Sequence, residues 1–202
     1  MSPRSIDLPA ARRDGGVSLE AALHHRCSTR DFNAAALTLG ELGQLLWAAQ
    51  GVTHGDGLRT APSAGALYPL EMYVVAGRIR DLDDGVYKYR PGAHHLTVIK
   101  QQDLRPALAA AALEQFSVSE CAALLVFAAV LARTTRKYGR RGSRYVHMEV
   151  GHAAQNVFLQ ATALGLGAVV VGAFDDARVR GIMALPEGEE ALYLMPVGRP
   201  AQ

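Results

Sequence analysis

Cysteines and long apolar runs are scarce in this chain of 202 residues. Cys27 lies in an arginine-rich segment and Cys121 opens an apolar run, so the two do not form a disulfide framework. The longest apolar stretch, residues 121–132, is too short to span a bilayer. The first residues also lack the apolar core of a signal peptide. We therefore expect a cytoplasmic protein in a reducing compartment, with no membrane partner.

Net charge is also small. The 21 lysines and arginines against 19 acidic residues leave a formal charge of +2, which argues against a generic binder of polyanions. One basic run lies between Arg133 and Arg144, and it is compatible with a solvated loop. It lacks the interleaved aromatic residues of a base-stacking surface, so we expect no nucleic-acid partner.

The composition and the sequence patterns predict one domain of mixed structure. Half of the residues are hydrophobic, which is enough for a sizeable core at this length. We expect an N-terminal tail over residues 1–17 and a single α+β domain over residues 18–202. Helical patterns cover residues 18–25, 38–51, 103–115, 144–164 and 176–184; strand patterns cover residues 70–76, 85–90, 95–100, 122–130, 168–171 and 191–195.

The segment 62–69, Pro-Ser-Ala-Gly-Ala-Leu-Tyr-Pro, is the most informative part of the chain. A proline fixes φ at each end, Gly65 and the alanines leave the backbone bare, and Ser63 adds a hydroxyl. Such a segment lets a flat ligand approach the main chain closely. A tight surface loop is the alternative reading of the same residues.

A second candidate element is Arg26-Cys27-Ser28-Thr29-Arg30, just after the first predicted helix. If this turn stays roughly helical, both guanidinium groups reach one side with the Ser28 hydroxyl nearby. Two planar sets of donors and a short hydroxyl suit a phosphate monoester. A solvated charged turn remains the alternative.

The third element is the glycine-rich segment 165–174. Gly165 and Gly167 do not begin a dinucleotide-binding motif, because a helix precedes them and a strand follows. Gly165 fits a simple helix stop. Gly172 and Ala173 at the strand end would leave main-chain groups free to meet the edge of a ligand ring.

Together these elements resemble the nitroreductase family of FMN-dependent oxidoreductases. The resemblance implies a central, mainly antiparallel sheet flanked by helices, in an intertwined homodimer that binds FMN. It assigns Arg26, Ser28 and Arg30 to the FMN phosphate, with Cys27 at the variable position of that motif and Arg199 closing on the phosphate. It also assigns Pro62, Ser63, Ala64 and Gly65 to a loop that contacts the flavin held mainly by the partner subunit, and Val171, Gly172 and Ala173 to the flavin ring.

Within that family the chain resembles most the SagB-type group, which includes thiazoline and oxazoline oxidases of modified-peptide pathways. The segment 62–69, the run Lys137-Tyr138-Gly139 and the helical segment 149–156 carry this likeness. The resemblance makes Lys137 and Tyr138 the catalytic pair. Tyrosine is a weak base, with a reference pKa of about 10, so Tyr138 needs the Lys137 ammonium to stabilise its anion. Adjacent residues do not share a helical face, so we expect an irregular backbone over residues 136–142.

Three readings of the function stay open. The chain acts as an azoline oxidase on a small or peptide-borne heterocycle, or as a nitro or quinone reductase with NAD(P)H as electron donor. Alternatively it is a scaffold subunit without turnover. Metal binding is not expected, because His147 and His152 are five residues apart rather than at zincin spacing.

Overall fold

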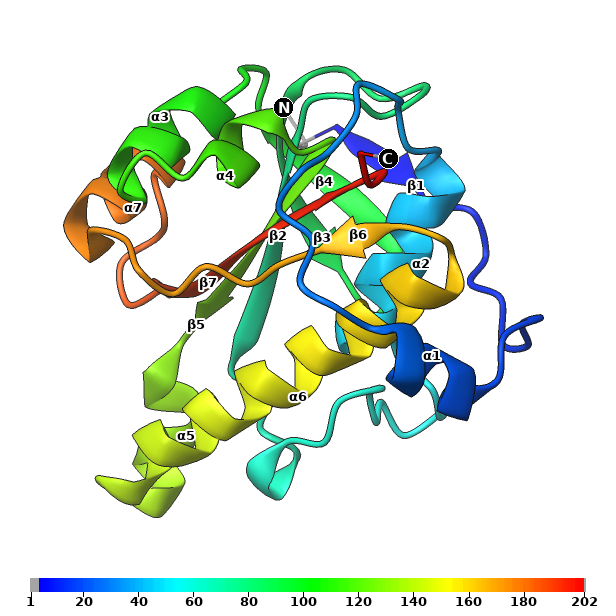
Figure 1. Ribbon diagram of the computed structural model, residues 1–202. Coiled ribbons are helices and arrows are strands. Elements are labelled where there is room, and N and C mark those ends of the chain that lie inside the picture. The colour runs from blue at the N-terminus through cyan, green and yellow to red at the C-terminus, as the bar shows by residue number, and fades with distance from the viewer. Residues whose placement is uncertain (1–3, 202) are drawn as a thin grey trace.

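The computed structural model describes residues 4–201 as one seven-stranded sheet between two layers of helices (Figure 1). The strand order is β1-β4-β3-β2-β5-β7-β6, and every neighbouring pair is antiparallel. The strands are β1 (Ser5–Asp7), β2 (Leu70–Ala76), β3 (Gly85–Arg90), β4 (His95–Lys100), β5 (Ala123–Ala129), β6 (Gly167–Ala168) and β7 (Glu190–Gly198). The α+β class and the mainly antiparallel sheet are confirmed.

Each face of the sheet carries its own apolar core. The helices are α1 (Leu19–His25), α2 (Leu39–Gln50), α3 (Arg105–Ala111), α4 (Phe116–Glu120), α5 (Leu131–Tyr138), α6 (Arg141–Ala163) and α7 (Asp176–Met183), with a short 3-10 turn, η1, at Ala64–Ala66. Helices α2 and α6 cover one face, and α3, α4 and α7 cover the other (Figure 1). The central strand β5 is buried along its whole length because it is covered on both sides.

Local sequence signals account for most of these elements. The Thr38 side chain accepts from the Glu41 amide, and the Glu41 carboxylate accepts from the Thr38 amide, which completes the capping box that starts α2. Strands β2, β3 and β4 occupy the predicted residues 70–76, 85–90 and 95–100. Helix α1 starts after its N-cap, Ser18, whose side chain accepts from the Ala21 amide, within the predicted segment 18–25.

The structure departs from the expected elements in four places. Residues 5–7, expected in the N-terminal tail, pair with β4 as an edge strand. The helix expected over 103–115 is shortened to α3, and α4 follows it outside the predicted range. The strand expected over 168–171 shrinks to β6 and a single bridge between Val171 and Leu194.

The fourth departure is α5, which replaces the irregular segment expected around Lys137 and Tyr138. A helix runs to Tyr138, breaks at Gly139 with φ of +57°, and resumes as α6 at Arg141. A Cβ on Gly142 would lie 2.7 Å from the Thr135 backbone, so the absence of a side chain there permits close packing of α5 on α6. Helix α5 is short, polar in composition and buries only Thr134, so it lacks the apolar core face that predicted the longer helices.

Candidate functional site

The loop after Pro62 holds an unusual backbone. Gly65, Ala66 and Tyr68 have φ of +65°, +53° and +45°, the left-handed region that disfavours residues with a Cβ. The Ser63 hydroxyl ties this loop together, because its Oγ accepts a 2.9 Å hydrogen bond from the Tyr68 amide. Strained backbone of this kind persists only where surrounding contacts hold it, and it concentrates at functional sites.

Lys137 and Tyr138 both reach this loop. A Cβ placed on Gly65 would lie 2.7 Å from Tyr138 Oη and 3.0 Å from Lys137 Nζ. The Lys137 ammonium is 5.4 Å from the centre of the Tyr138 ring. The irregular backbone expected over residues 136–142 is found at Gly139, where φ is +57°, but not at Lys137 and Tyr138, which belong to the last turn of α5. Their side chains nevertheless converge on one glycine.

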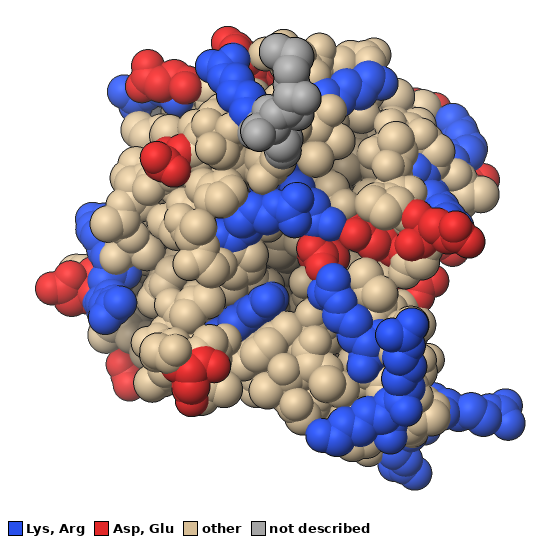
Figure 2. Space-filling view, turned by 180° about the vertical axis from the view of Figure 1, so that it is seen from behind, with Lys and Arg blue, Asp and Glu red and all other residues tan. Residues whose placement is uncertain are grey.

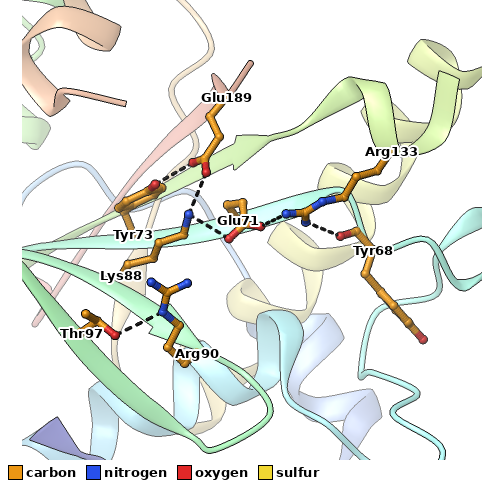
Figure 3. A network of polar contacts seen from close by, with 8 residues as sticks. All are labelled: Tyr68, Glu71, Tyr73, Lys88, Arg90, Thr97, Arg133 and Glu189. Atoms are coloured by element: carbon orange, nitrogen blue, oxygen red, sulfur yellow. Dashed lines mark hydrogen bonds and ion pairs between the residues drawn. The ribbon is translucent and has the colours of Figure 1, made fainter. Parts of the chain in front are cut away.

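An ion-pair network fixes the start of α5 against the same loop (Figure 3). Arg133 donates to the Tyr68 carbonyl over 3.0 Å and pairs with Glu71 on β2. Lys88 on β3 then bridges Glu71 at 3.0 Å and Glu189 at 2.8 Å. Burial acts to raise the pKa of Glu71, but Lys88 and Arg133 outweigh it and hold the pKa below its usual value. The network therefore holds charged Glu71 and Arg133 beside the loop.

Glu149, on α6, contacts the loop from its other side. Ser63 Oγ donates a 2.6 Å hydrogen bond to Glu149 Oε2, and the residue is only 2% exposed. Burial raises the pKa of this carboxyl to about 7, against smaller opposing effects of the Ser63 hydrogen bond and of Arg59. The Ser63 hydrogen is thus committed to Glu149, although Ser63 was expected to bond to the flavin.

The sequence did not assign a role to Glu149 or Arg133. A signal for Glu149 was present: Val146, Val150 and Ala153 around it are all buried, so a carboxylate stands within an apolar helix face. No sequence pattern pointed to Arg133, because its partners, Glu71 on β2 and Tyr68 in the loop, are distant in the sequence.

The arginine element is extended rather than helical. Arg26 ends α1 with ψ of 121°, and Ser28 forms a parallel bridge with Ala168. Side chains alternate along extended backbone, so a segment extended through Arg30 would place Arg26, Ser28 and Arg30 on one side without the helical turn that was expected. Ser28 and Arg30 are exposed, and the Arg26 guanidinium lies 5.4 Å from the Phe158 ring centre.

The chain end lies beside this element. The Asn33 amide donates to the Arg199 carbonyl over 3.0 Å, and Phe32 pairs with Pro200. The Arg199 guanidinium forms a 2.8 Å ion pair with Glu41 of the α2 capping box. The structure therefore brings Arg199 near the arginine element, with part of its guanidinium already engaged by a carboxylate.

The predicted ring-binding residues are divided between core and surface. Val171 is buried and its amide donates to the Leu194 carbonyl over 2.7 Å, whereas Gly172 and Ala173 are exposed. Gly172 lines a cavity of about 670 Å³ together with Phe174 and Tyr193. The exposed backbone of Gly172 and Ala173 beside this cavity is suited to contact with a planar ligand ring.

Two groups of predicted residues thus form at separate places on α6. The loop 62–65 with Lys137 and Tyr138 gathers around Glu149, and the arginine element lies by Phe158. Nine residues separate these positions, which is about 14 Å along a helix axis. The donor set of the arginine element, guanidinium groups with an exposed hydroxyl, fits a phosphate such as that of FMN.

Basic side chains gather where α5 and α6 meet, at the lower right of Figure 2. Within residues 4–201, Arg133 is the member of the run 133–144 that forms an ion pair. The same described part of the chain has no helix long and apolar enough to cross a membrane. It also has no group of three or more His, Cys, Asp or Glu side chains able to hold a metal ion.

Comparison with known proteins identifies the family. The nitroreductase family model matches residues 23–199. MJ1384 of Methanocaldococcus jannaschii, a provisionally named nitroreductase, is 50% identical over 183 residues, which is 91% of each chain. The microcin B17-processing protein McbC of Escherichia coli is 30% identical over 140 residues, 66% of this chain and 51% of McbC.

A solved structure gives the same answer. A protein of Anabaena variabilis that is provisionally described as a nitroreductase superposes with a TM-score of 0.88 at 31% identity. The match covers 98% of this chain and 42% of that one, so the chain spans about half or less of the Anabaena and McbC proteins. Sequence and fold together show that the chain belongs to the nitroreductase family of oxidoreductases.

Proposed function

We propose that this protein is an FMN-dependent oxidoreductase of the SagB type, which oxidises an azoline to an azole on a small or peptide-borne substrate. The observation that carries the proposal is the convergence of Tyr138 Oη and Lys137 Nζ on Gly65. The similarity to McbC, a microcin B17-processing protein, supports a peptide-borne substrate.

FMN would be held through its phosphate by Arg26, Ser28, Arg30 and Arg199, and through its ring by the exposed backbone at Gly172 and Ala173. When bound, FMN supplies the two-electron acceptor for the hydride that leaves the heterocycle. Because the Ser63 hydroxyl donates to Glu149, the loop 62–65 would contact the flavin ring through its backbone.

The protein's own part in the reaction is proton transfer. Tyr138 Oη takes the ring proton as the hydride leaves, and the Lys137 ammonium stabilises the phenolate that must form first. Gly65 leaves room for both groups, because even a methyl group at this position would press on them. Arg133 fixes the start of α5, four residues before Lys137, to the loop that carries Gly65.

We further propose a homodimer in which each flavin is served by both subunits. The arginine element contacts α6 at Phe158, and the loop that meets Lys137 and Tyr138 contacts it at Glu149, about 14 Å away along the helix axis. In the dimer, the arginine element of one subunit and the loop with the catalytic pair of the other subunit complete one site.

The experiment is the replacement Tyr138→Phe, tested on a synthetic thiazoline peptide. The variant should keep FMN and reduce a quinone normally, while azole formation falls by about 10²–10⁴-fold. Tyr145→Phe is the matched control, because its ring packs edge-to-face on Tyr138 at 5.2 Å and loses the same single oxygen. Normal azole formation by Tyr138→Phe would defeat the assignment.

The second candidate function is NAD(P)H-dependent reduction of nitro or quinone compounds. It is favoured by the 50% identity to MJ1384, whose name points to that activity. Wild-type protein that reduces nitro compounds with NADPH but leaves thiazolines unchanged would select this alternative. Purified protein that stays colourless with added FMN would select the scaffold reading.

A further inference from the structure

Helix α6 is linked to the loop of residues 63–68 (the loop 63–68) through a buried carboxyl group. Ser63 Oγ donates to Glu149 Oε2 over 2.6 Å, while Glu149 Oε1 is buried and has no hydrogen-bond partner among residues 4–201. An unpaired buried carboxylate oxygen is costly, so its retention on an apolar helix face calls for a specific reason.

The same hydroxyl links Glu149 to the strained end of the loop. Ser63 Oγ accepts from the Tyr68 amide over 2.9 Å, and Tyr68 holds a φ of +45°. Between them, Gly65 stands against Tyr138 and Lys137. A change at Glu149 is therefore transmitted through one hydroxyl to the backbone that positions the catalytic pair.

We propose that Glu149 is a positioning residue, which latches the loop 63–68 onto α6 through Ser63 and so fixes Gly65 against Tyr138 and Lys137. This inference rests on the proposed function for its consequence in catalysis. The attachment of the loop 63–68 to α6 does not depend on catalysis, so it can be measured without turnover.

The latch depends on the protonation of Glu149. Among residues 4–201, the Arg59 guanidinium, from the loop before Pro62, is the cation that lowers the pKa of Glu149. Tyr145 and His152 of α6 line the same cavity of about 280 Å³ as Glu149. Burial of the carboxyl has the largest effect and raises its pKa from 4.5 to about 7. The closed loop thus holds the proton more tightly than an opened loop in which Glu149 is hydrated.

Proton linkage then sets the direction. Between about pH 4.5 and 7 an opened loop gives up the proton that the closed loop still holds, so opening becomes more favourable as pH rises through this range and levels off above about pH 7. If opening hydrates Glu149 fully, ionisation favours the open loop by up to about 300-fold. We expect azole formation to lose activity as pH rises toward 7 and to stay low above it, as Gly65 and the catalytic pair lose their fixed positions.

Three variants separate this latch from a merely structural role. Glu149→Gln keeps an oxygen that accepts from Ser63, but its side chain cannot ionise. This variant should therefore stay active above pH 7, so the decrease of activity with pH disappears from its profile. Glu149→Ala should be impaired at every pH. Glu187→Gln, at an exposed glutamate, should leave the profile unchanged.

Hydrogen exchange at the Tyr68 amide reports on the latch independently of turnover. After correction for intrinsic rates, exchange at pH 8.5 should be at least about tenfold slower in Glu149→Gln than in the wild type. Ser63→Ala removes a hydrogen bond that lowers the pKa of Glu149, so an acid-base titration of that carboxyl should move to higher pH.

The outcomes are separable. Equal Tyr68 exchange in the wild type and Glu149→Gln would overturn the latch, whatever the activities. Slower exchange with an unchanged pH profile would also overturn it, since the loop would then not position the pair. If Tyr138→Phe turns over normally, the proposed function falls, while the Tyr68 exchange rates still decide for or against the latch.

Discussion

Gly65 offers the sharpest single test of the site. Its φ of +65° lies in the left-handed region, where an alanine costs roughly 1–2 kcal/mol. The added Cβ would also lie 2.7 Å from Tyr138 Oη and 3.0 Å from Lys137 Nζ, closer than carbon atoms approach such groups. Gly65→Ala should therefore strain the backbone and displace both reacting groups.

Gly57 is a matched control. Its φ is +85°, yet a Cβ there would meet no atom within 4 Å. Gly57→Ala should thus show the backbone cost alone, roughly 1–2 kcal/mol, with normal turnover. Gly65→Ala should cost little more stability than this, because Tyr138 Oη and Lys137 Nζ are the ends of side chains that can shift, but it should lose about 100-fold in azole formation, because a displacement near 1 Å can have that effect.

The assay combines thermal unfolding, FMN fluorescence and azole formation. For a chain of this size each 1 kcal/mol lowers Tm by roughly 2–4 °C, so both variants should melt a few degrees below the wild type, and azole formation is the measurement that separates them. Adding Tyr138→Phe to Gly65→Ala removes the nearest clashing atom and should recover part of the stability. If Gly65→Ala turned over as fast as Gly57→Ala, the argument that the pair works at Gly65 would fail.

Three further outcomes are expected. Replacement of Arg26 and Arg30 together by alanine should weaken FMN binding by about 3 kcal/mol or more without unfolding the protein, measured by fluorescence titration; unchanged affinity would place the phosphate elsewhere. Because the pKa of Glu149 is raised to about 7, the stability it contributes is full below about pH 4.5 and is lost as pH rises through 7. Glu149→Gln should remove this loss of about 3 kcal/mol from urea unfolding curves; a parallel pH dependence in both proteins would contradict it. Mixed dimers of the arginine double variant and Tyr138→Phe should regain azole formation, because one of their two sites combines unchanged arginines with an unchanged Tyr138. A mixture that stays inactive would refute sites shared between subunits.

Sequence patterns located the regular elements where burial dictates residue type. Strand β2 is buried along almost all of its length and was predicted at its observed bounds, because a continuous apolar run between a proline and a glycine leaves little choice. The capping box at Thr38 is equally local, since its two hydrogen bonds join residues three apart. The family was also recognisable, because it depends on short motifs in a fixed order.

Helix α5 and the edge strand β1 needed the tertiary structure. Helix α5 is polar on most of its surface, and its position depends on Gly142 and on the ion pair between Arg133 and Glu71. Strand β1 forms because β4 has an unpaired edge. The paired residues lie about 90 positions apart in the sequence, so no local pattern predicts the pairing.

The residues of the candidate site divide in the same way. The sequence by itself determined which side chains could carry the chemistry: the arginines with Ser28, the bare loop at Gly65, and Lys137 beside Tyr138. Only the tertiary structure decided how they combine: it placed the catalytic pair on Gly65 despite a helical backbone, and it engaged Ser63 with Glu149. The physical reason is that burial, ion pairing and hydrogen bonding depend on neighbours distant in sequence, and these set both the pKa of Glu149 and the shape of the loop.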